Sequence, residues 1–481
     1  MSSPVRSKPN FMALGKFTSP ALLLAASLVS SCTVGPDYSR PPVTTPSVYK
    51  ETIGAKTPAV DDVFGLKWWE VFGDSDLNAL EEQVDISSQN IAQAEARFRQ
   101  ARALVQSARA AYYPTVTVGI GVTGMQQSPT SQSRNPKTKN AFPEYTLPID
   151  VSWELDVWGR IRRSVESNEA SAQASAADLE GARLSARAEV AQDYFLIQSL
   201  DAQIRLVDAS VVAFQKSLDL TNNRYNTGVA SRGDVLQAET QLKTTQAQAI
   251  DLGVLRSQME HALAVLMGRA PADFSLAVRP VVAEPPAIPA GVPEELLVRR
   301  PDVASAERTM AAANAQIGIA QSAYYPTVSI NTSGGLESES IGNWFSVLGR
   351  FWSAGISATQ TLFDGGLRQS QVEHARAVYD ENVAAYRETV LNGFQEVEDN
   401  LAAQRILTNE AQVQDDAVKA AEQSLAVIMN QYQAGIVSYL NVIVAQTLAL
   451  NNEKTAVDVQ GRRLNAAVLL VKALGGGWKA S

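Results

Sequence analysis

The 481-residue chain has few of the side chains on which catalysis and metal binding usually depend. It contains one cysteine, Cys32, and two histidines, His261 and His374, neither of which has a second histidine at ligand spacing. One thiol excludes an intrachain disulfide, and isolated histidines do not form a metal site. The carboxylates are spread along helix faces, as on a solvated surface, rather than paired for acid/base work. The sequence therefore predicts neither an enzyme nor a bound metal or cofactor.

Long hydrophobic runs are also missing. After the first 31 residues, no segment approaches the ~18 consecutive apolar residues of a transmembrane helix, so any membrane spanning must be done by strands. The first 31 residues carry three basic and no acidic side chains, which leaves 38 basic against 50 acidic residues and a net charge of −12 without them. That balance argues against a nucleic-acid partner.

The N-terminus has the pattern of a bacterial secretory signal. Arg6, Lys8 and Lys16 precede an apolar run over residues 21–29, which is too short to span a membrane. Cys32 stands where a lipoprotein signal would be cleaved and the cysteine acylated, and the alternative is a chance cysteine behind an ordinary signal. By resemblance to bacterial lipoproteins, Thr33 after the cysteine favours the outer membrane. Residues 32–66, with five prolines, predict an extended lipidated tether.

Proline is absent from residues 151–270 and from the whole chain after Pro326, and the two tracts carry the same signals about 207 residues apart. The turn over residues 225–231 (YNTGVAS) returns at 432–438 (YQAGIVS), and residues 110–117 (AAYYPTVT) return at 322–329 (SAYYPTVS). Residues 160–226 and 367–433 each predict one helix, ~100 Å long at 1.5 Å per residue, which implies coiled-coil packing. Gly228 and Gly435 can close these helices in the left-handed conformation.

The chain is thus predicted to be an internal duplication with repeats at 67–275 and 276–478. A helix capped by Asp74 or Ser75 is expected to run to about residue 111, and a helix at ~301–323 takes its place in the second repeat. Return helices are expected at ~231–267 and ~438–474. Alternation of apolar and polar residues predicts four strands, at ~113–123, ~145–156, ~326–334 and ~352–363.

These strands have the pattern of membrane strands. Leu147, Ile149, Val151 and Trp153 alternate with polar residues that include Asp150 and Glu154, which suits a lipid-facing side with a watery lumen behind it. Aromatic residues cluster at the strand ends, as in an interfacial girdle, although they could also cap a soluble sheet. Four strands cannot close a barrel and an open edge is not tolerated in lipid. Three chains would give twelve strands and a lumen.

Four motifs give the mature chain a resemblance to the TolC family of outer-membrane efflux factors, in the lipoprotein branch typified by OprM and NodT-type proteins. They are residues 68–72 (WWEVF), 153–160 (WELDVWGR), 297–303 (LVRRPDV) with Glu307, and 473–478 (ALGGGW). The resemblance implies an α+β membrane protein: a homotrimeric duct with a 12-stranded outer-membrane β-barrel, continued in the periplasm by an α-helical coiled-coil barrel. It further implies a passive conduit that docks a periplasmic adaptor and, through it, an inner-membrane pump of the resistance-nodulation-division (RND) class.

The resemblance also assigns residues to the periplasmic tip. The gate residues would be Gly228, Asp234, Tyr432, Gly435 and Leu440, and the adaptor-docking residues would be Tyr225, Gly228, Ser231, Tyr432, Gly435 and Ser438. Tyr432 and Asp234 match positions that link neighbouring helix pairs in closed relatives, and Leu440 matches an apolar constriction. The plainer alternative is that Tyr432 only packs between helices and Asp234 only caps the returning helix.

The chain departs from its relatives at three tip positions. Asn441 and Val444 stand where relatives have acidic rings, and Val437 stands where some have arginine. An acidic, cation-selecting gate is therefore not predicted. The alternative function within the class is the duct of a type I protein secretion system. A periplasmic adaptor with one helical hairpin is a further alternative, which the duplication and the strands oppose.

Overall fold

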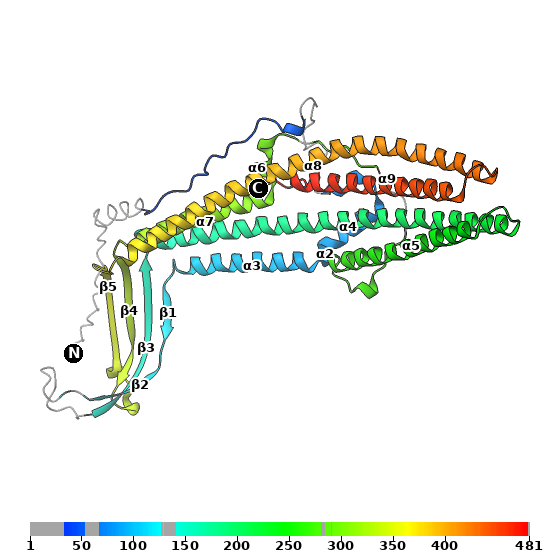
Figure 1. Ribbon diagram of the computed structural model, residues 1–481. Helices are drawn as coiled ribbons and strands as arrows, with labels where there is room; N and C mark the ends of the chain where they lie inside the picture. The colour runs from blue at the N-terminus through cyan, green and yellow to red at the C-terminus, as the bar shows by residue number, and fades with distance from the viewer. Residues whose placement is uncertain are drawn as a thin grey trace, which may run out of the picture. The chain divides into compact units, whose positions relative to one another are not determined.

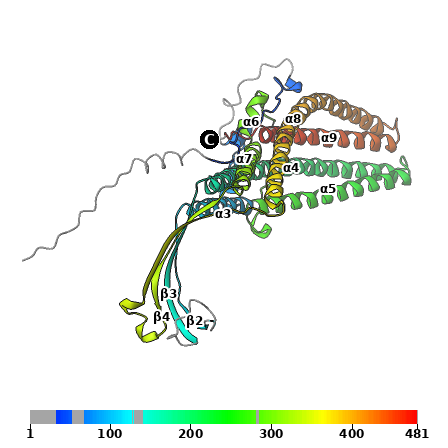
Figure 2. The same cartoon turned by 90° about the vertical axis from the view of Figure 1, so that its left-hand side faces the viewer.

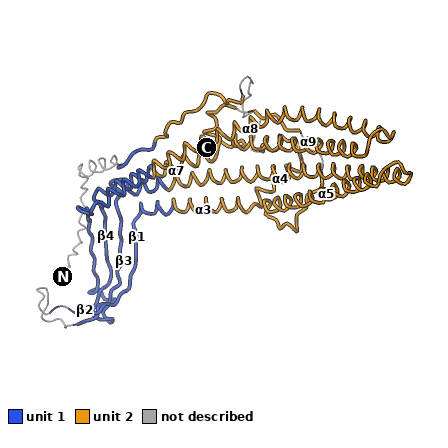
Figure 3. The backbone as a smooth tube through the Cα atoms, viewed as in Figure 1, with its two compact units in different colours: residues 1–38, 106–167, 314–377 blue, residues 39–105, 168–313, 378–481 orange. Residues whose placement is uncertain are grey.

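A computed structural model describes residues 33–52, 67–126, 128, 141–279, 284–289 and 291–479. The chain forms two compact units (Figure 3), one of residues 1–38, 106–167 and 314–377 and the other of residues 39–105, 168–313 and 378–481. The units do not follow the duplication, because each unit takes segments from both repeats. The predicted signal segment and Cys32 lie outside the described residues.

The first unit contains one antiparallel sheet with the strand order β1-β3-β4-β5, and β2 pairs beside β1 on the same edge of β3. The strands are β1 (Thr115–Val118), β2 (Gly121–Gln126), β3 (Ala141–Leu155), β4 (Thr327–Ser338) and β5 (Arg350–Thr359) (Figure 1). The strand expected at ~113–123 is thus two strands in one position. Their interruption lies opposite Pro148, whose nitrogen cannot donate to the ladder, although Gly119 N–H still donates to Pro148 O at 3.0 Å.

The strand register sorts the side chains by polarity. Ser152 pairs with Asn331, Glu154 with Ser329, and Ser329 with Ser357, so polar residues of three strands share one face of the sheet. Ser152 Oγ donates to Asn331 Oδ1 at 3.1 Å, and the hydroxyls of Ser329 and Ser357 lie 2.9 Å apart. The opposite face carries large exposed apolar residues, among them Val116, Val118, Ile149, Trp352 and Ile356. The alternation expected from the sequence is therefore present in the register.

α-Helices make up most of the described residues, and the two longest have 67 residues each. In chain order the α-helices are α2 (Ser75–Ser87), α3 (Gln89–Ala110), α4 (Arg160–Asn226), α5 (Arg232–Leu266), α6 (Leu296–Arg299), α7 (Pro301–Ser322), α8 (Leu367–Gln433) and α9 (Tyr439–Ala473). Figures 1 and 2 show α4 with α5, and α8 with α9, as two antiparallel hairpins. No helix of the described residues is long and apolar enough to cross a membrane.

One helix expected to run from Asp74 to about residue 111 is instead two. Asp74 caps α2 by accepting from the amides of Asp76 and Leu77, but the chain turns extended at Ser88 before α3 begins. The Ser87 hydroxyl bonds Met267 O at 2.7 Å, and Ser87 O lies where a Cβ on Gly268 would clash. The break therefore lies where α2 contacts the end of α5, a long-range contact that helix spacing does not reveal.

The expected tether is extended, but its described part is bound to the rest of the chain. Within the strand unit, the Arg163 guanidinium bonds the carbonyl oxygens of Val34 and Gly35 and the carboxylate of Asp37. Within the helical unit, Arg40 donates to Tyr386 Oη at 2.8 Å, and the Glu398 carboxylate accepts from the amides of residues 50 and 51. Residues 33–51 are therefore bound to the rest of the protein rather than forming a free linker, and we call them the N-terminal strap.

Two apolar clusters hold the helical hairpins of the second unit together. Val207 and Phe214 of α4 pack with Leu242 of α5 and Leu450 of α9. Nearer the helix ends, Tyr432 of α8 packs with Ala238 of α5 and with Tyr439 and Val442 of α9. Both clusters join the first hairpin to the second.

Candidate functional site at the helix turns

Each long helix ends in the same backbone structure. Gly228 and Gly435 have φ values of 74° and 79°, which glycine adopts without the steric penalty of a side chain. Val229 N–H donates to Arg224 O at 2.8 Å and Gly228 N–H to Tyr225 O at 2.9 Å, the paired hydrogen bonds of a Schellman motif. The second turn repeats them, from Ile436 to Gln431 and from Gly435 to Tyr432. The two glycines are therefore required by backbone geometry.

The returning helices begin differently in the two repeats. Asp234 and Ser231 form a capping box on α5: the Asp234 amide donates to Ser231 Oγ at 3.1 Å, and the Ser231 amide donates to Asp234 Oδ2 at 2.9 Å. Ser438 makes no side-chain cap on α9, and Asn441, which takes the place of Asp234, has only a 3.4 Å contact with its hydroxyl. The carboxylate of the first turn thus has no counterpart in the second.

Tyr432 lies inside the helix bundle rather than on its surface. Its side chain is 3% exposed, and its ring centre lies 5.4 Å from that of Tyr439. Its hydroxyl lies 3.2 Å from Thr221 Oγ1 on α4, and the Thr221 hydroxyl in turn donates to Ser217 O at 2.8 Å. Burial raises the pKa of the neighbouring Tyr439 to about 12. The Tyr439 phenol is thereby packed as a neutral group.

The structure does not bring the Tyr432 hydroxyl and the Asp234 carboxylate together within one chain. The hydroxyl contacts Thr221, and the carboxylate accepts from Ser231. Val437 packs half-buried on the same cluster as Tyr432. Both plainer roles, packing for Tyr432 and capping for Asp234, are thus filled, while a latch between helix pairs stays a prediction.

Arg224 is a tip residue that the sequence reading missed. Its guanidinium donates from α4 to Tyr432 O at 2.7 Å and to Gln433 O at 3.1 Å, and it lies 4.7 Å from the Tyr432 ring centre. A cation that bonds the last carbonyls of a helix satisfies orphan acceptors and complements the helix dipole. Comparison of the two repeats could have identified Arg224, because the equivalent position in the second copy is the neutral Gln431.

The remaining tip residues are exposed. Gly228, Ser231, Gly435 and Ser438 lie on the surface, as does part of Tyr225. The residue after each glycine has an exposed apolar side chain, which we call a knob: Val229 is 65% exposed and Ile436 is 72% exposed. Leu440 is also exposed, followed one and two turns along α9 by Val444 and Leu448. The tip therefore offers apolar knobs at both turns and an apolar stripe on α9 only.

Comparison with known proteins places this geometry in one family. A family model described as outer membrane efflux protein matches residues 80–269 and 292–476. The antibiotic efflux pump outer membrane protein ArpC of Pseudomonas putida is 28% identical over 462 residues, 95% of each chain, and the cation efflux system protein CusC of Escherichia coli is 26% identical over 467 residues, 96% of this chain and all of that one. The solved outer-membrane channel OprN superimposes with a TM-score of 0.85 at 29% identity, over 93% of this chain and all of OprN. The chain belongs to the outer membrane efflux protein family.

Proposed function

We propose that three copies of this outer-membrane efflux component form one duct, which conducts small compounds passively from an RND-type pump through a periplasmic adaptor. The family consists of outer-membrane channels of tripartite efflux systems, not enzymes. The observation that carries the finer proposal is the pair of glycine turns, each with one exposed apolar knob at the end of a helical hairpin. A passive duct needs such docking points and no catalytic group.

The trimer is inferred from the sheet edges. In the strand order β1-β3-β4-β5, the outer edge formed by β1 and β2 and the outer edge of β5 have no partner strand among the described residues. Such edges are not tolerated in lipid, and twelve strands from three chains would close them around a lumen. Disulfide cross-linking in membranes between one cysteine in β1 and one in β5 should give trimers on a non-reducing gel. The control is the double variant Ser152→Cys, Asn331→Cys, whose two cysteines face each other on neighbouring strands of one chain and should form a disulfide within it. If the β1–β5 cysteine pair also gave only monomers, the trimer would be contradicted.

Adaptor docking can be tested at the knobs. A photo-cross-linker at Val229 or Ile436 should capture the adaptor in cells that express the full pump. The same probe at Ile250, which is 75% exposed on α5 but distant in sequence from both turns, should not. Equal capture at Ile250 would show that docking does not use the turns.

The fold of this protein does not determine which compound is exported. ArpC is named for antibiotic efflux and CusC for cation efflux, yet the chain is similar to both to nearly the same extent. We infer that the pump selects the compound and this protein supplies the exit. Expression with an adaptor and RND pump in a strain without its own outer-membrane component should restore resistance to the pump's substrates. Restored protein secretion without restored resistance would instead support the type I alternative.

A further inference from the structure

One face of α9 is exposed along most of the helix. The exposed positions recur three and four residues apart, which places them in a single stripe: Leu440, Val444, Leu448, Asn451, Thr455, Asp458 and Arg462. The stripe is apolar near the turn and becomes polar after Leu448. The side of the helix that carries Leu440, and that would line the duct under the proposed function, therefore also carries Asp458 and Arg462.

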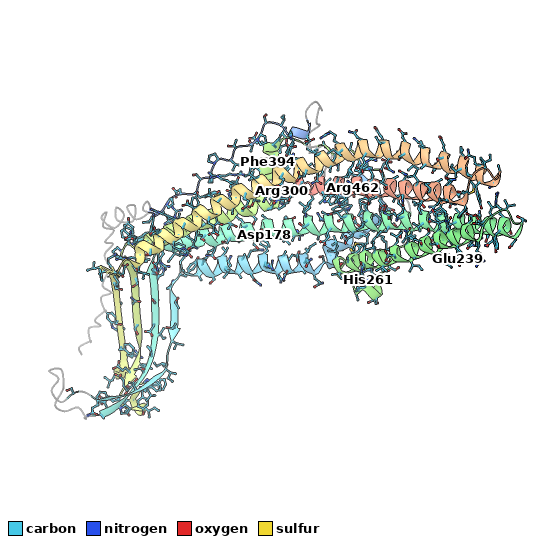
Figure 4. The ribbon with its side chains drawn as sticks, in the orientation of Figure 1. Asp178, Glu239, His261, Arg300, Phe394 and Arg462 are labelled. Atoms are coloured by element: carbon cyan, nitrogen blue, oxygen red, sulfur yellow. The ribbon has the colours of Figure 1, made fainter. Side chains whose placement is uncertain are left out.

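A cavity of about 230 Å³ opens where the charged part of this stripe meets α4. Gly461 permits the close approach of the two helices, since a Cβ there would lie 2.9 Å from Ser199 Oγ. The α4 wall is partly apolar: Phe195 is 1% exposed, whereas Leu196 is 46% exposed. Figure 4 labels Arg462, which lines the α9 side together with Asp458. The cavity thus has an apolar wall and charged groups in one small volume.

The charges around this cavity do not balance. Arg462 is shared by two carboxylates, Asp458 at 3.9 Å and Glu410 at 3.5 Å. Asp193, which also lines the cavity, forms no hydrogen bond or ion pair within the described part of the chain. Burial, and secondly the nearby Glu189, raises the pKa of Asp193 to about 6. Arg462 is paired with other carboxylates, so Asp193 is a half-buried carboxylate with no ion pair among the described residues, a costly arrangement that a positively charged ligand would relieve.

We propose that the cavity binds the ammonium end of amine-bearing compounds as they pass through the duct, an inference that rests on the proposed function. Asp193 accepts a hydrogen bond from the ammonium group, and Leu196 contacts the adjoining hydrocarbon. A cavity of this size is below the ~300–1,000 Å³ of sites for whole drug-sized ligands, so it takes only one end of a larger molecule. The result is a weak, charge-selective resting place, which suits a conduit because cargo must leave as readily as it enters.

The direct test is a binding measurement on the purified, assembled full-length protein. Calorimetric titration with benzylammonium is compared with benzyl alcohol, which has the same ring and no charge. The Asp193→Asn variant should bind benzylammonium about tenfold more weakly, since a charge-assisted hydrogen bond is lost, and should bind benzyl alcohol as before. Asp178→Asn makes the same change at an exposed position of the same helix, outside the cavity (Figure 4), and should leave both affinities unchanged.

The pH dependence gives a second readout. Affinity for benzylammonium should fall as pH is lowered through about 6, where Asp193 becomes protonated, and Asp193→Asn should remove most of that dependence. The charged groups that face Asp193 are Glu189 on its own helix and Asp458 and Arg462 on α9.

Two outcomes would overturn the inference: equal affinity for benzylammonium and benzyl alcohol, or an equal loss of affinity in Asp178→Asn. The proposed function is tested separately by restoration of export. A wild-type protein that restores export without charge-selective binding overturns only the cavity. One that never restores export contradicts the conduit whatever it binds.

Discussion

Replacement of Arg224 by alanine tests how the two hairpins are fastened at the tip. The guanidinium supplies hydrogen bonds to the last carbonyls of α8, at Tyr432 and Gln433, and packs on the Tyr432 ring. Without it, those carbonyls lose a charged donor from α4, while the contact between the Tyr432 and Thr221 hydroxyls remains. We therefore expect the last turn of α8 to open more often in Arg224→Ala.

The size of the effect follows from these contacts. A hydrogen bond to a charged group contributes about 1.5–3 kcal/mol when buried, but Arg224 is only half-buried, which lowers its contribution. An exposed cation–π contact adds about 0.5–1 kcal/mol. Together these contacts should contribute at least about 2 kcal/mol to the free energy of opening the last turn of α8. Their loss corresponds to roughly a 30-fold rise in the open population, because about 1.4 kcal/mol is a factor of ten.

Hydrogen–deuterium exchange measures this opening directly, on peptides that cover the end of α8 in the assembled protein. Exchange there should be roughly 30-fold faster in Arg224→Ala and intermediate in Arg224→Lys, which keeps the charge but loses the planar fork. Arg232→Ala removes an exposed arginine at the start of α5 that has no hydrogen bond or ion pair among the described residues. If hydrogen exchange at the end of α8 were equally fast in both alanine variants, Arg224 would not be the residue that holds the two hairpins together.

Three further predictions concern the tip and the core. If Tyr432 and Asp234 form a latch between helix pairs in the trimer, Tyr432→Phe and Asp234→Asn should each raise planar-bilayer conductance, with a subadditive double mutant; unchanged conductance in both would leave closure to apolar packing. Gly435→Ala should loosen the α8 turn by about 1–2 kcal/mol because φ is positive, seen as faster local exchange, whereas Gly253→Ala inside α5, where a Cβ meets no atom within 4 Å, should not. Burial raises the pKa of Glu81 well above its ordinary 4.5, and neither carboxyl oxygen has a hydrogen-bond partner among the described residues. Ionisation of Glu81 therefore costs more free energy in the folded state than in the unfolded state, so the fold loses stability as pH rises above 4.5. Glu81→Gln should accordingly melt higher than wild type near pH 8 and at the same temperature near pH 4.

Local sequence signals were enough for the parts of the fold that local chemistry determines. The ends of α4 and α8 follow from where proline and glycine stand, and the Schellman motifs at Gly228 and Gly435 are the reason for those glycines. The face polarity of the strands followed from period-two alternation, because a strand has no other way to separate its side chains.

Three features that local sequence signals do not reveal depend on contacts between distant segments. The break at Ser88 accompanies a contact with Met267, and the interruption of the first strand faces Pro148 on another strand. The docking of the N-terminal strap needs Tyr386, more than 300 residues away from Arg40. Arg224 differs from these features, because its contact to the other hairpin arises from a difference between the repeats: the equivalent position in the second repeat is the neutral Gln431.

The two repeats have different side chains at the two helix turns. The first turn holds the charged groups, with Arg224 bonded to the neighbouring hairpin and Asp234 in the α5 cap. At the equivalent positions the second has the neutral Gln431 and Asn441, and it alone carries the apolar stripe that begins at Leu440. The two hairpins have equal lengths, with helices of 67 and 35 residues in each. After divergence, the charged contact between the hairpins belongs to one repeat and the exposed apolar stripe belongs to the other.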